Sequence, residues 1–306
     1  MADKKLIAKK LIILLILMFV LDRGIGALLE HFYFTQKSGF DARANYIINK
    51  TNADVLVFGS SKAAEHYDPS ILSDSLKMSV YNCGRDLSYI YYHYGLLQAV
   101  LKRYTPKLII LDTRPNEFQI FKYRENLDRL NVLLPYYDSH PELREVCLLR
   151  DKFERYKMLS KIYPYNSLIL YEMVQFLPKY QKDNSENGFI GKTGEWHGNK
   201  PAYNVNDEVD TTAALYYKKF IESCRAKGIK VVITMSPIYQ TIDVKANRNI
   251  ALIYQIARKN NVPVFNYLTS FTNPKYFYDD LHLNRSGAEL LSSKIAQDVK
   301  SVYRLK

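Results

Sequence analysis

The stretch VLVFGSSKAAEHYDPS, residues 55–70, decides the fold and raises the first question about function. An apolar run typical of a buried strand ends at Gly59, Ser60 and Ser61, and a helical pattern follows. A serine there lies at the carboxyl edge of a sheet and at a helix start, where free N–H groups and the helix dipole favour an alkoxide. Gly-Ser-Ser also caps ordinary helices, so a structural turn and a nucleophilic serine both remain open.

Apolar runs like this one recur along the chain, at 54–58, 78–82, 107–111, 229–234 and 263–266. Helical patterns lie between them, at 87–103, 212–227, 246–260 and 286–303. Continuous apolar runs of about five residues are typical of strands buried on both faces of a parallel sheet. The alternation predicts an α/β fold, a three-layer α/β/α sandwich with about five parallel strands.

The third and fourth of these runs are too far apart in the chain for one crossover helix. We therefore predict a largely helical insertion at about 114–210, within a domain that covers 51–306. Helical stretches are expected at Asp151–Lys161 and Ser167–Tyr180, followed by a polar loop. An insertion on the side of the strand carboxyl ends would cover the edge where open α/β sheets bind ligands.

The N-terminal segment, residues 1–29, is typical of a signal anchor. Lys4, Lys5, Lys9 and Lys10 precede the unbroken apolar run Leu11–Leu21. The run is short for a membrane span, and extending it includes Asp22 and Arg23. We favour an uncleaved anchor; a cleaved signal peptide and a buried helix of a soluble protein are the alternatives. The lysines predict a cytoplasmic N-terminus and an extracytoplasmic domain, with 30–50 as a connector.

Composition excludes several classes of protein. The net charge is +12, yet the basic residues are dispersed outside the N-terminus and no nucleic-acid-binding signature is present. We expect no nucleic-acid partner. The three cysteines form no CxxC motif, and no metal cluster, dinucleotide fingerprint or phosphate loop occurs, so we expect neither metal nor cofactor.

A nucleophilic serine needs a base, and the base needs an orienting group. The stretch YFYDDLHLNRSGAELL, residues 276–291, contains both before the last helix. Asp279 and His282 are three residues apart, which in a turn brings the carboxylate to Nδ1 and leaves Nε2 free. Asp280 is a rival with a less suitable spacing. We predict that Ser61, His282 and Asp279 form a catalytic triad.

Together these residues resemble the SGNH/GDSL hydrolase superfamily, over about 54–112 and 211–303 but not over the insertion. Ser61 matches the family's nucleophile, Gly84 in VYNCGRD matches its oxyanion-hole glycine, and Asp279 and His282 match its last motif. The resemblance implies a flavodoxin-like SGNH fold and serine esterase chemistry. It also implies an oxyanion hole built from the N–H groups of Ser61 and Gly84, with Asn82 close to substrate.

The third motif of the family departs from its usual Gly-x-Asn-Asp. Here the strand ends in LIILDTRPNEF, residues 108–118. Asn116 is offset from the usual asparagine, and Arg114, Asp112 or Thr113 takes its place. We expect Arg114 or Asn116 to complete the oxyanion hole, or Arg114 to hold an anionic substrate.

The variant motif and the anchor resemble an extracytoplasmic subgroup, the D-alanyl transfer proteins of teichoic-acid operons and the acetyl-transfer proteins of alginate synthesis. The resemblance implies acyl transfer to or from a cell-envelope polysaccharide, beside a membrane-bound O-acyltransferase as partner. Trp196 and His197 are candidates for a sugar subsite through aromatic stacking. His66 is expected to be structural or at the surface, and SPIYQ, residues 236–240, is a candidate for the cleft wall.

The sequence thus predicts a membrane-anchored, extracytoplasmic serine esterase or O-acyltransferase acting on acyl, chiefly acetyl, esters of polysaccharide. A catalytically degenerate SGNH domain that binds polysaccharide, or that serves as a scaffold for the acyltransferase, is the alternative. A nucleotide-binding α/β protein is a third hypothesis, weakened because the sequence has no phosphate loop.

Overall fold

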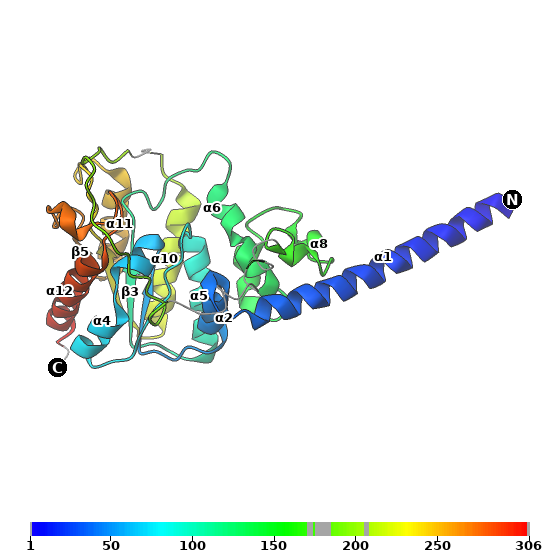
Figure 1. The fold of residues 1–306 in the computed structure, drawn as a ribbon, viewed down its shortest axis with the longest axis horizontal. Coiled ribbons are helices and arrows are strands. Elements are labelled where there is room, and N and C mark those ends of the chain that lie inside the picture. Colours follow the sequence, from blue (N-terminus) through cyan, green and yellow to red (C-terminus); the bar gives the residue numbers. More distant parts are fainter. Residues whose placement is uncertain (1, 170–173, 175–184, 205–207, 305–306) are drawn as a thin grey trace. The chain divides into compact units, whose positions relative to one another are not determined.

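The structure is a computed structural model that describes residues 2–169, 174, 185–204 and 208–304 (Figure 1). Its contacts divide the chain into two compact units. Unit 1 comprises Met1–Ala42 and Leu130–Asp183, and unit 2 comprises Arg43–Arg129 and Asn184–Lys306. Each unit is described by itself, and the boundaries of the anchor, connector and insertion remain predictions.

Unit 2 is built on one parallel sheet with the strand order β2-β1-β3-β4-β5. This order is that of flavodoxin-like doubly wound folds, in which ligands bind outside the carboxyl ends of the strands where the order reverses. The predicted α/β class is confirmed. The strands are β1 (Val55–Phe58), β2 (Val80–Asn82), β3 (Leu108–Asp112), β4 (Lys230–Met235) and β5 (Val264–Asn266).

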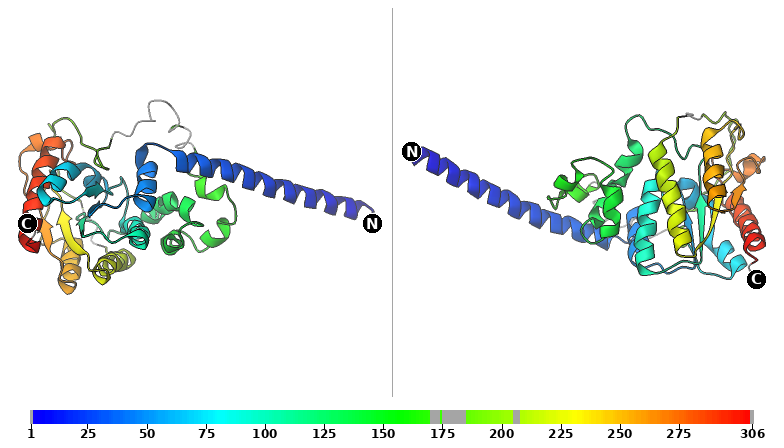
Figure 2. Two further views of the ribbon diagram at one scale, coloured as in Figure 1. Left: turned by 90° about the horizontal axis from the view of Figure 1, so that it is seen from below. Right: turned by 180° about the vertical axis from the view of Figure 1, so that it is seen from behind.

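Helices cover both faces of the sheet (Figure 2). The successive side chains of β1 alternate between the faces. Val55 and Val57 pack in a core with apolar residues of α4 and α12, whereas the Phe58 ring lies 5.3 Å from that of Phe220 in α10 and 6.2 Å from that of His93 in α5. The helices of unit 2 are α3 (Ser61–His66), α4 (Pro69–Leu76), α5 (Ile90–Arg103), α6 (Glu125–Asp128), α10 (Thr211–Ala226), α11 (Arg248–Lys259) and α12 (Arg285–Tyr303).

Unit 1 begins with the helix α1 (Ala2–Thr35), whose segment Lys4–Thr35 is long and apolar enough to cross a membrane, with a mean hydropathy of 2.4 in its most apolar window. The helix α2 (Gly39–Asn49) follows and runs on into unit 2. The other elements given for the described part of unit 1 are short: the 3₁₀ turns η1 (Arg129–Tyr136), η2 (Pro141–Leu143) and η3 (Tyr163–Tyr165), and the helices α7 (Arg144–Cys147) and α8 (Glu154–Lys157).

The helix predicted over Asp151–Lys161 is wrong, because only Glu154–Lys157 is helical. Hydrogen bonds between residues three apart replace the helical ladder on both sides of α8, and the Asp151 carboxylate accepts from the Phe153 N–H at 2.7 Å. Most of the helix predicted over Ser167–Tyr180 lies outside the described residues.

Candidate active site

The strand β1 delivers Ser61 to the carboxyl edge of the sheet through a tight turn. Gly59 has φ +149°, and a Cβ on it would lie 2.8 Å from both the Ala63 Cβ and the Asp112 carbonyl oxygen. Only glycine fits this position without displacing its neighbours. Ser60 then occupies the N-cap position of α3, without a side-chain capping bond, and Ser61 is the first helical residue.

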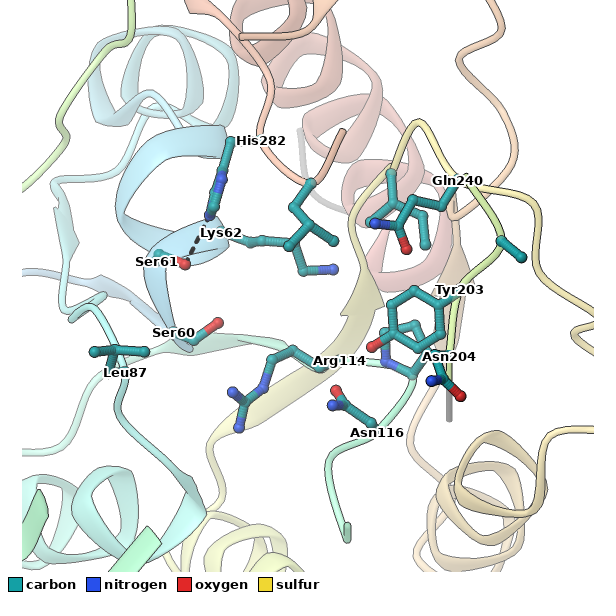
Figure 3. Close-up of a pocket in the computed structure, with 14 residues that line it drawn as sticks. Ser60, Ser61, Lys62, Leu87, Arg114, Asn116, Tyr203, Asn204, Gln240 and His282 are labelled. Atoms are coloured by element: carbon teal, nitrogen blue, oxygen red, sulfur yellow. Dashed lines mark hydrogen bonds between the residues drawn. The ribbon is translucent and has the colours of Figure 1, made fainter. Parts of the chain in front are cut away.

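The chain positions His282 beside this serine (Figure 3), and Asp279 lies on the far side of the imidazole ring. The Ser61 Oγ lies 2.9 Å from the His282 Nε2. On the other side of the ring, Nδ1 lies 2.9 and 3.0 Å from the two carboxylate oxygens of Asp279. Because Nδ1 faces a carboxylate, we assign its proton there, which leaves Nε2 to accept from the Ser61 hydroxyl.

The loop before α12 fixes the aspartate as well as the histidine. Asp279 Oδ1 accepts from the backbone N–H groups of Leu281 at 2.8 Å and His282 at 2.7 Å. This Asx-type turn orients the carboxylate towards the imidazole of the residue three positions later. The predicted spacing therefore produces the expected geometry through local hydrogen bonds.

The charges around the imidazole act on its pKa in opposite directions. Burial lowers the pKa of His282, but the hydrogen bond to Asp279 and the charges of Glu65 and Asp279 outweigh it, so the pKa is raised. Burial raises the pKa of Asp279, yet the bond and charge of His282 hold it below its usual value. A raised pKa for His282 and a lowered pKa for Asp279 are the shifts expected of a carboxylate that stabilises an imidazolium.

Two residues of α3 act on His282: His66 packs near its ring and binds the next residue, and the charge of Glu65 raises its pKa. His66 is fully buried, its Nε2 accepts from the Leu283 N–H at 2.9 Å, and its ring lies 6.1 Å from that of His282. Burial holds the pKa of His66 well below its usual value, which keeps the ring neutral and able to accept. Glu65 is also buried and pairs with Lys192 at 3.2 Å. Glu65 was not predicted from the sequence, although it follows Ser61 by one helical turn.

A cavity of about 480 Å³ opens in front of Ser61 and His282 (Figure 3). Arg114 and Asn116 line it, as do Ile238 and Gln240 of the predicted cleft wall. Three polar lining residues were not predicted from the sequence: Lys62, Tyr203 and Asn204. For Lys62 the available signal was its position next to Ser61, whereas Tyr203 and Asn204 carried none.

Lys62 and Arg114, the lysine and the arginine of the cavity wall, have different kinds of partner. Lys62 is 4% exposed, and its Nζ lies 3.4 Å from the Ser236 carbonyl oxygen. Burial lowers the pKa of Lys62, which the charge of Asp112 partly offsets. The Arg114 Nε donates to Glu117 at 3.4 Å, and its guanidinium lies 4.6 Å from the centre of the Tyr89 ring.

The structure does not bring Asn82 into the cavity. Its side-chain amide donates to the carbonyl oxygens of Ala63 at 2.7 Å and Tyr67 at 2.8 Å, and its Oδ1 accepts from the Gly84 N–H at 2.9 Å. These bonds tie the end of β2 to α3, so Asn82 has a structural role here. They also occupy the N–H group that the family resemblance assigns to the oxyanion hole.

Other candidates also lie away from the cavity. Trp196 donates from Nε1 to the Asn199 carbonyl oxygen at 3.2 Å and packs on the core, and neither it nor His197 is a lining residue. Asp112 accepts from the Tyr67 hydroxyl at 2.5 Å and from the Ser236 N–H at 3.0 Å, which ties β3 to β4. Among the described residues, no group of three metal-ligating side chains is placed to hold an ion.

No protein-family model matches the chain, and no curated protein sequence does. Solved structures with some likeness include a family two carbohydrate esterase from Clostridium thermocellum, at 7% identity and TM-score 0.45 over 82% of this chain and 64% of the esterase. An acetyl xylan esterase has 12% identity and a TM-score of 0.40, and the match covers 80% of this chain and 99% of the esterase. A Bacteroides fragilis protein provisionally assigned as an acylhydrolase has 13% identity and a TM-score of 0.40. The match covers 81% of this chain and 86% of that protein.

The class that the fold and site of this chain define is an α/β protein with a Ser-His-Asp constellation at the carboxyl edge of its sheet.

Proposed function

We propose that this chain is a membrane-anchored SGNH-type serine esterase or O-acyltransferase that acts on acyl esters of a cell-envelope polysaccharide. One observation carries the proposal. Ser61 Oγ, His282 and Asp279 form a continuous chain of contacts of 2.9 Å each, and the serine and histidine open onto a cavity. A serine that only begins a helix needs neither a histidine at its hydroxyl nor a carboxylate at the other nitrogen of that histidine.

The chemistry follows from these contacts. The Ser61 Oγ attacks the ester carbonyl carbon while the His282 Nε2 takes the hydroxyl proton, and Asp279 stabilises the imidazolium. The tetrahedral intermediate collapses with cleavage of the ester C–O bond, and the imidazolium protonates the departing alkoxide. Water, or a sugar hydroxyl, then attacks the acyl-serine ester as His282 takes its proton. The acid or the new ester leaves, and Ser61 regains its proton.

The oxyanion of the intermediate needs donors other than the Gly84 N–H, which Asn82 occupies. The Ser61 N–H lies in the first turn of α3, where no intrahelical acceptor is available. Arg114 and Asn116 line the same cavity and carry donors beyond those used in their bonds to Glu117 and Gln119. We assign the second oxyanion contact to one of these two side chains.

The cavity wall suits an acidic glycan. Lys62 and Arg114 present positive groups, while Tyr203, Asn204 and Gln240 offer hydrogen-bonding groups that match sugar hydroxyls. A carboxylate or phosphate on the substrate would favour the charged form of the buried Lys62. Lys62→Met is therefore expected to raise KM more for an acetylated uronic-acid oligomer than for a neutral acetylated xylan oligomer. Equal effects on both would contradict the acidic preference.

The anchoring is proposed from α1, whose apolar segment follows the cluster of lysines at the N-terminus. The positive-inside rule then places the site outside the cytoplasm. The resemblance of the anchor and the third motif to envelope acyl-transfer proteins supports a membrane-bound O-acyltransferase as the partner that supplies or receives acyl groups.

The experiment is hydrolysis of acetylated oligosaccharides by the full-length protein in detergent, with and without a deacetylated acceptor. We expect acetate release that Ser61→Ala abolishes and that Ser60→Ala, one residue away, does not. Acetyl groups appearing on the acceptor identify a transferase, whereas acetate alone identifies an esterase. Release unaffected by Ser61→Ala would contradict the proposal.

A degenerate binding or scaffold domain is the second candidate function, and the occupied Gly84 N–H favours it. Such a domain would bind the oligosaccharides with the same affinity before and after Ser61→Ala and would release no acetate. Calorimetric titration alongside the hydrolysis assay separates the two candidates.

A further inference from the structure

The first helix divides into a bare part and a packed part, both within unit 1. The large apolar side chains of Leu6–Leu21 are 47–63% exposed. From Asp22 on, the helix is bound to a loop of its own unit. The Asp22 carboxylate accepts from the Lys161 N–H at 2.9 Å, and Arg23 donates to the Leu159 carbonyl oxygen at 2.8 Å.

The packed part continues beyond these two residues. Gly26 approaches the same loop so closely that a Cβ on it would lie 2.4 Å from the Lys161 Cβ. Further on, Tyr33 is 1% exposed and its hydroxyl donates to the Val132 carbonyl oxygen at 3.1 Å. Protein therefore covers one side of α1 after Leu21, and lipid can surround the helix only before it.

The bare part is close to the length that a bilayer needs. Leu6–Leu21 spans roughly 24 Å at 1.5 Å per residue, compared with a hydrocarbon core of about 30 Å. Lys4 and Lys5 precede this segment, and Lys9 and Lys10 can extend their ammonium groups towards the surface on that side. The outer boundary of the bilayer therefore falls at Asp22 and Arg23, the residues bound to the 159–161 loop.

Three large side chains are exposed on the segment that reaches this boundary. Phe153, Tyr156 and Leu159 are 53%, 68% and 70% exposed. The Tyr156 N–H donates to the Phe153 carbonyl oxygen at 2.9 Å, and the Leu159 N–H to that of Tyr156 at 3.1 Å. In such i→i+3 turns the side chains eclipse one another, so these three, here called the interfacial patch, share one face. α8 lies within this segment (Figure 1).

The segment that carries the interfacial patch is also basic. Its residues 148–161 contain five lysines and arginines against two acids. The Lys152 ammonium lies 4.9 Å from the centre of the Phe153 ring, beside the patch. Single exposed apolar residues are common on soluble proteins, but an aromatic and aliphatic face with basic neighbours is typical of membrane-interface segments.

We propose that the interfacial patch lies in the headgroup region of an anionic bilayer, as a second membrane contact beside α1. Tyr156 and Phe153 place their rings at the level of the headgroups, and Lys152 and Arg155 contact lipid phosphates. The contact fixes unit 1 against the surface from which α1 emerges. The inference rests on the proposed anchoring by α1 and is independent of the proposed ester chemistry.

The test uses the full chain with single added cysteines, since the native Cys83, Cys147 and Cys224 are buried. Leu159→Cys reports on the interfacial patch and Leu15→Cys on the bare helix. The matched control is Leu290→Cys, which changes an exposed leucine of α12 in unit 2. Each variant is labelled with an environment-sensitive fluorophore and reconstituted into phosphatidylglycerol/phosphatidylethanolamine vesicles that contain spin-labelled quencher lipids.

We expect a blue-shifted emission and lipid quenching for the labels at positions 159 and 15, and neither for the label at 290. Lys152→Glu with Arg155→Glu should weaken quenching at position 159 and leave position 15 unchanged. A label at 159 as solvent-exposed as that at 290, while the label at 15 is quenched, would overturn the patch and leave the anchor intact. Protection at 159 only in native membranes would assign the patch to a protein partner and overturn the lipid contact. A solvent-exposed label at 15 would overturn the anchor and the inference together.

Discussion

Replacing Asp279 by asparagine tests the electrostatic part of the proposed triad with the least change of shape. The Oδ1 of asparagine can keep the turn bonds to the Leu281 and His282 N–H groups. Its NH₂ group would then face the imidazole Nδ1, which favours the tautomer that carries its proton on Nε2. That proton points at the Ser61 hydroxyl, so the ring no longer accepts.

The expected loss follows from the same geometry. In a Ser-His-Asp triad, the asparagine change lowers kcat by about 10⁴ while the fold is kept. We expect Asp279→Asn to lower kcat for an acetyl ester by about 10³–10⁴ with little change in KM. The assay is initial-rate hydrolysis of an acetyl ester, with thermal unfolding measured on the same samples.

Asp280→Asn is the matched control for this substitution. Asp280 is adjacent in the loop, but its carboxylate accepts from Gln240 instead of from the imidazole. We expect this variant to keep its kcat within about tenfold, because it changes no group of the triad. An Asp279→Asn enzyme with more than about a tenth of the original kcat would refute the assigned role of Asp279.

Three further outcomes follow from the site. Activity should fall as the pH is lowered through the raised pKa of His282, because the base must be neutral. The acidic midpoint of a kcat/KM profile should therefore lie above 6.5, and a midpoint below that value would contradict His282 as the base. Arg114→Gln should lower kcat by about 10² or more with a smaller effect on KM if Arg114 contacts the oxyanion, whereas a rise in KM alone would restrict it to substrate binding. His66→Phe leaves the Leu283 N–H without its acceptor and should destabilise the fold by about 1–3 kcal/mol in urea unfolding, a loss that an unchanged midpoint would rule out.

The sheet was predictable because its signals are local. The strand predicted at 54–58 is found at Val55–Phe58, and that predicted at 107–111 at Leu108–Asp112, since continuous burial makes the apolar runs conspicuous. Ser61, Asp279 and His282 were predictable as a set because Ser61 ends a predicted strand, Asp279 and His282 precede the last predicted helix, and all three match motifs of the family that the sequence resembles.

The rest depended on side-chain partners that no spacing reveals. Gly84 was predicted to donate to the oxyanion and Asn82 to contact substrate, but in the structure the Gly84 N–H donates to the Asn82 side chain. Lys62 is buried in the cavity wall, which is rare for lysine. Short turns replace the helix predicted over residues 151–161 because the bond from the Phe153 N–H to the Asp151 carboxylate and the bonds between residues three apart stabilise turns there.

Whether Ser61 is an activated nucleophile is tested by intact-protein and peptide mass spectrometry after incubation of the full chain with a fluorophosphonate probe. We expect one adduct, on the peptide that contains Ser61. It should be absent from Ser61→Ala and from denatured protein, and it should form much more slowly in His282→Ala. No adduct on a folded chain that retains the 2.9 Å serine–histidine contact, or equal labelling of Ser61→Ala, would contradict this role of Ser61.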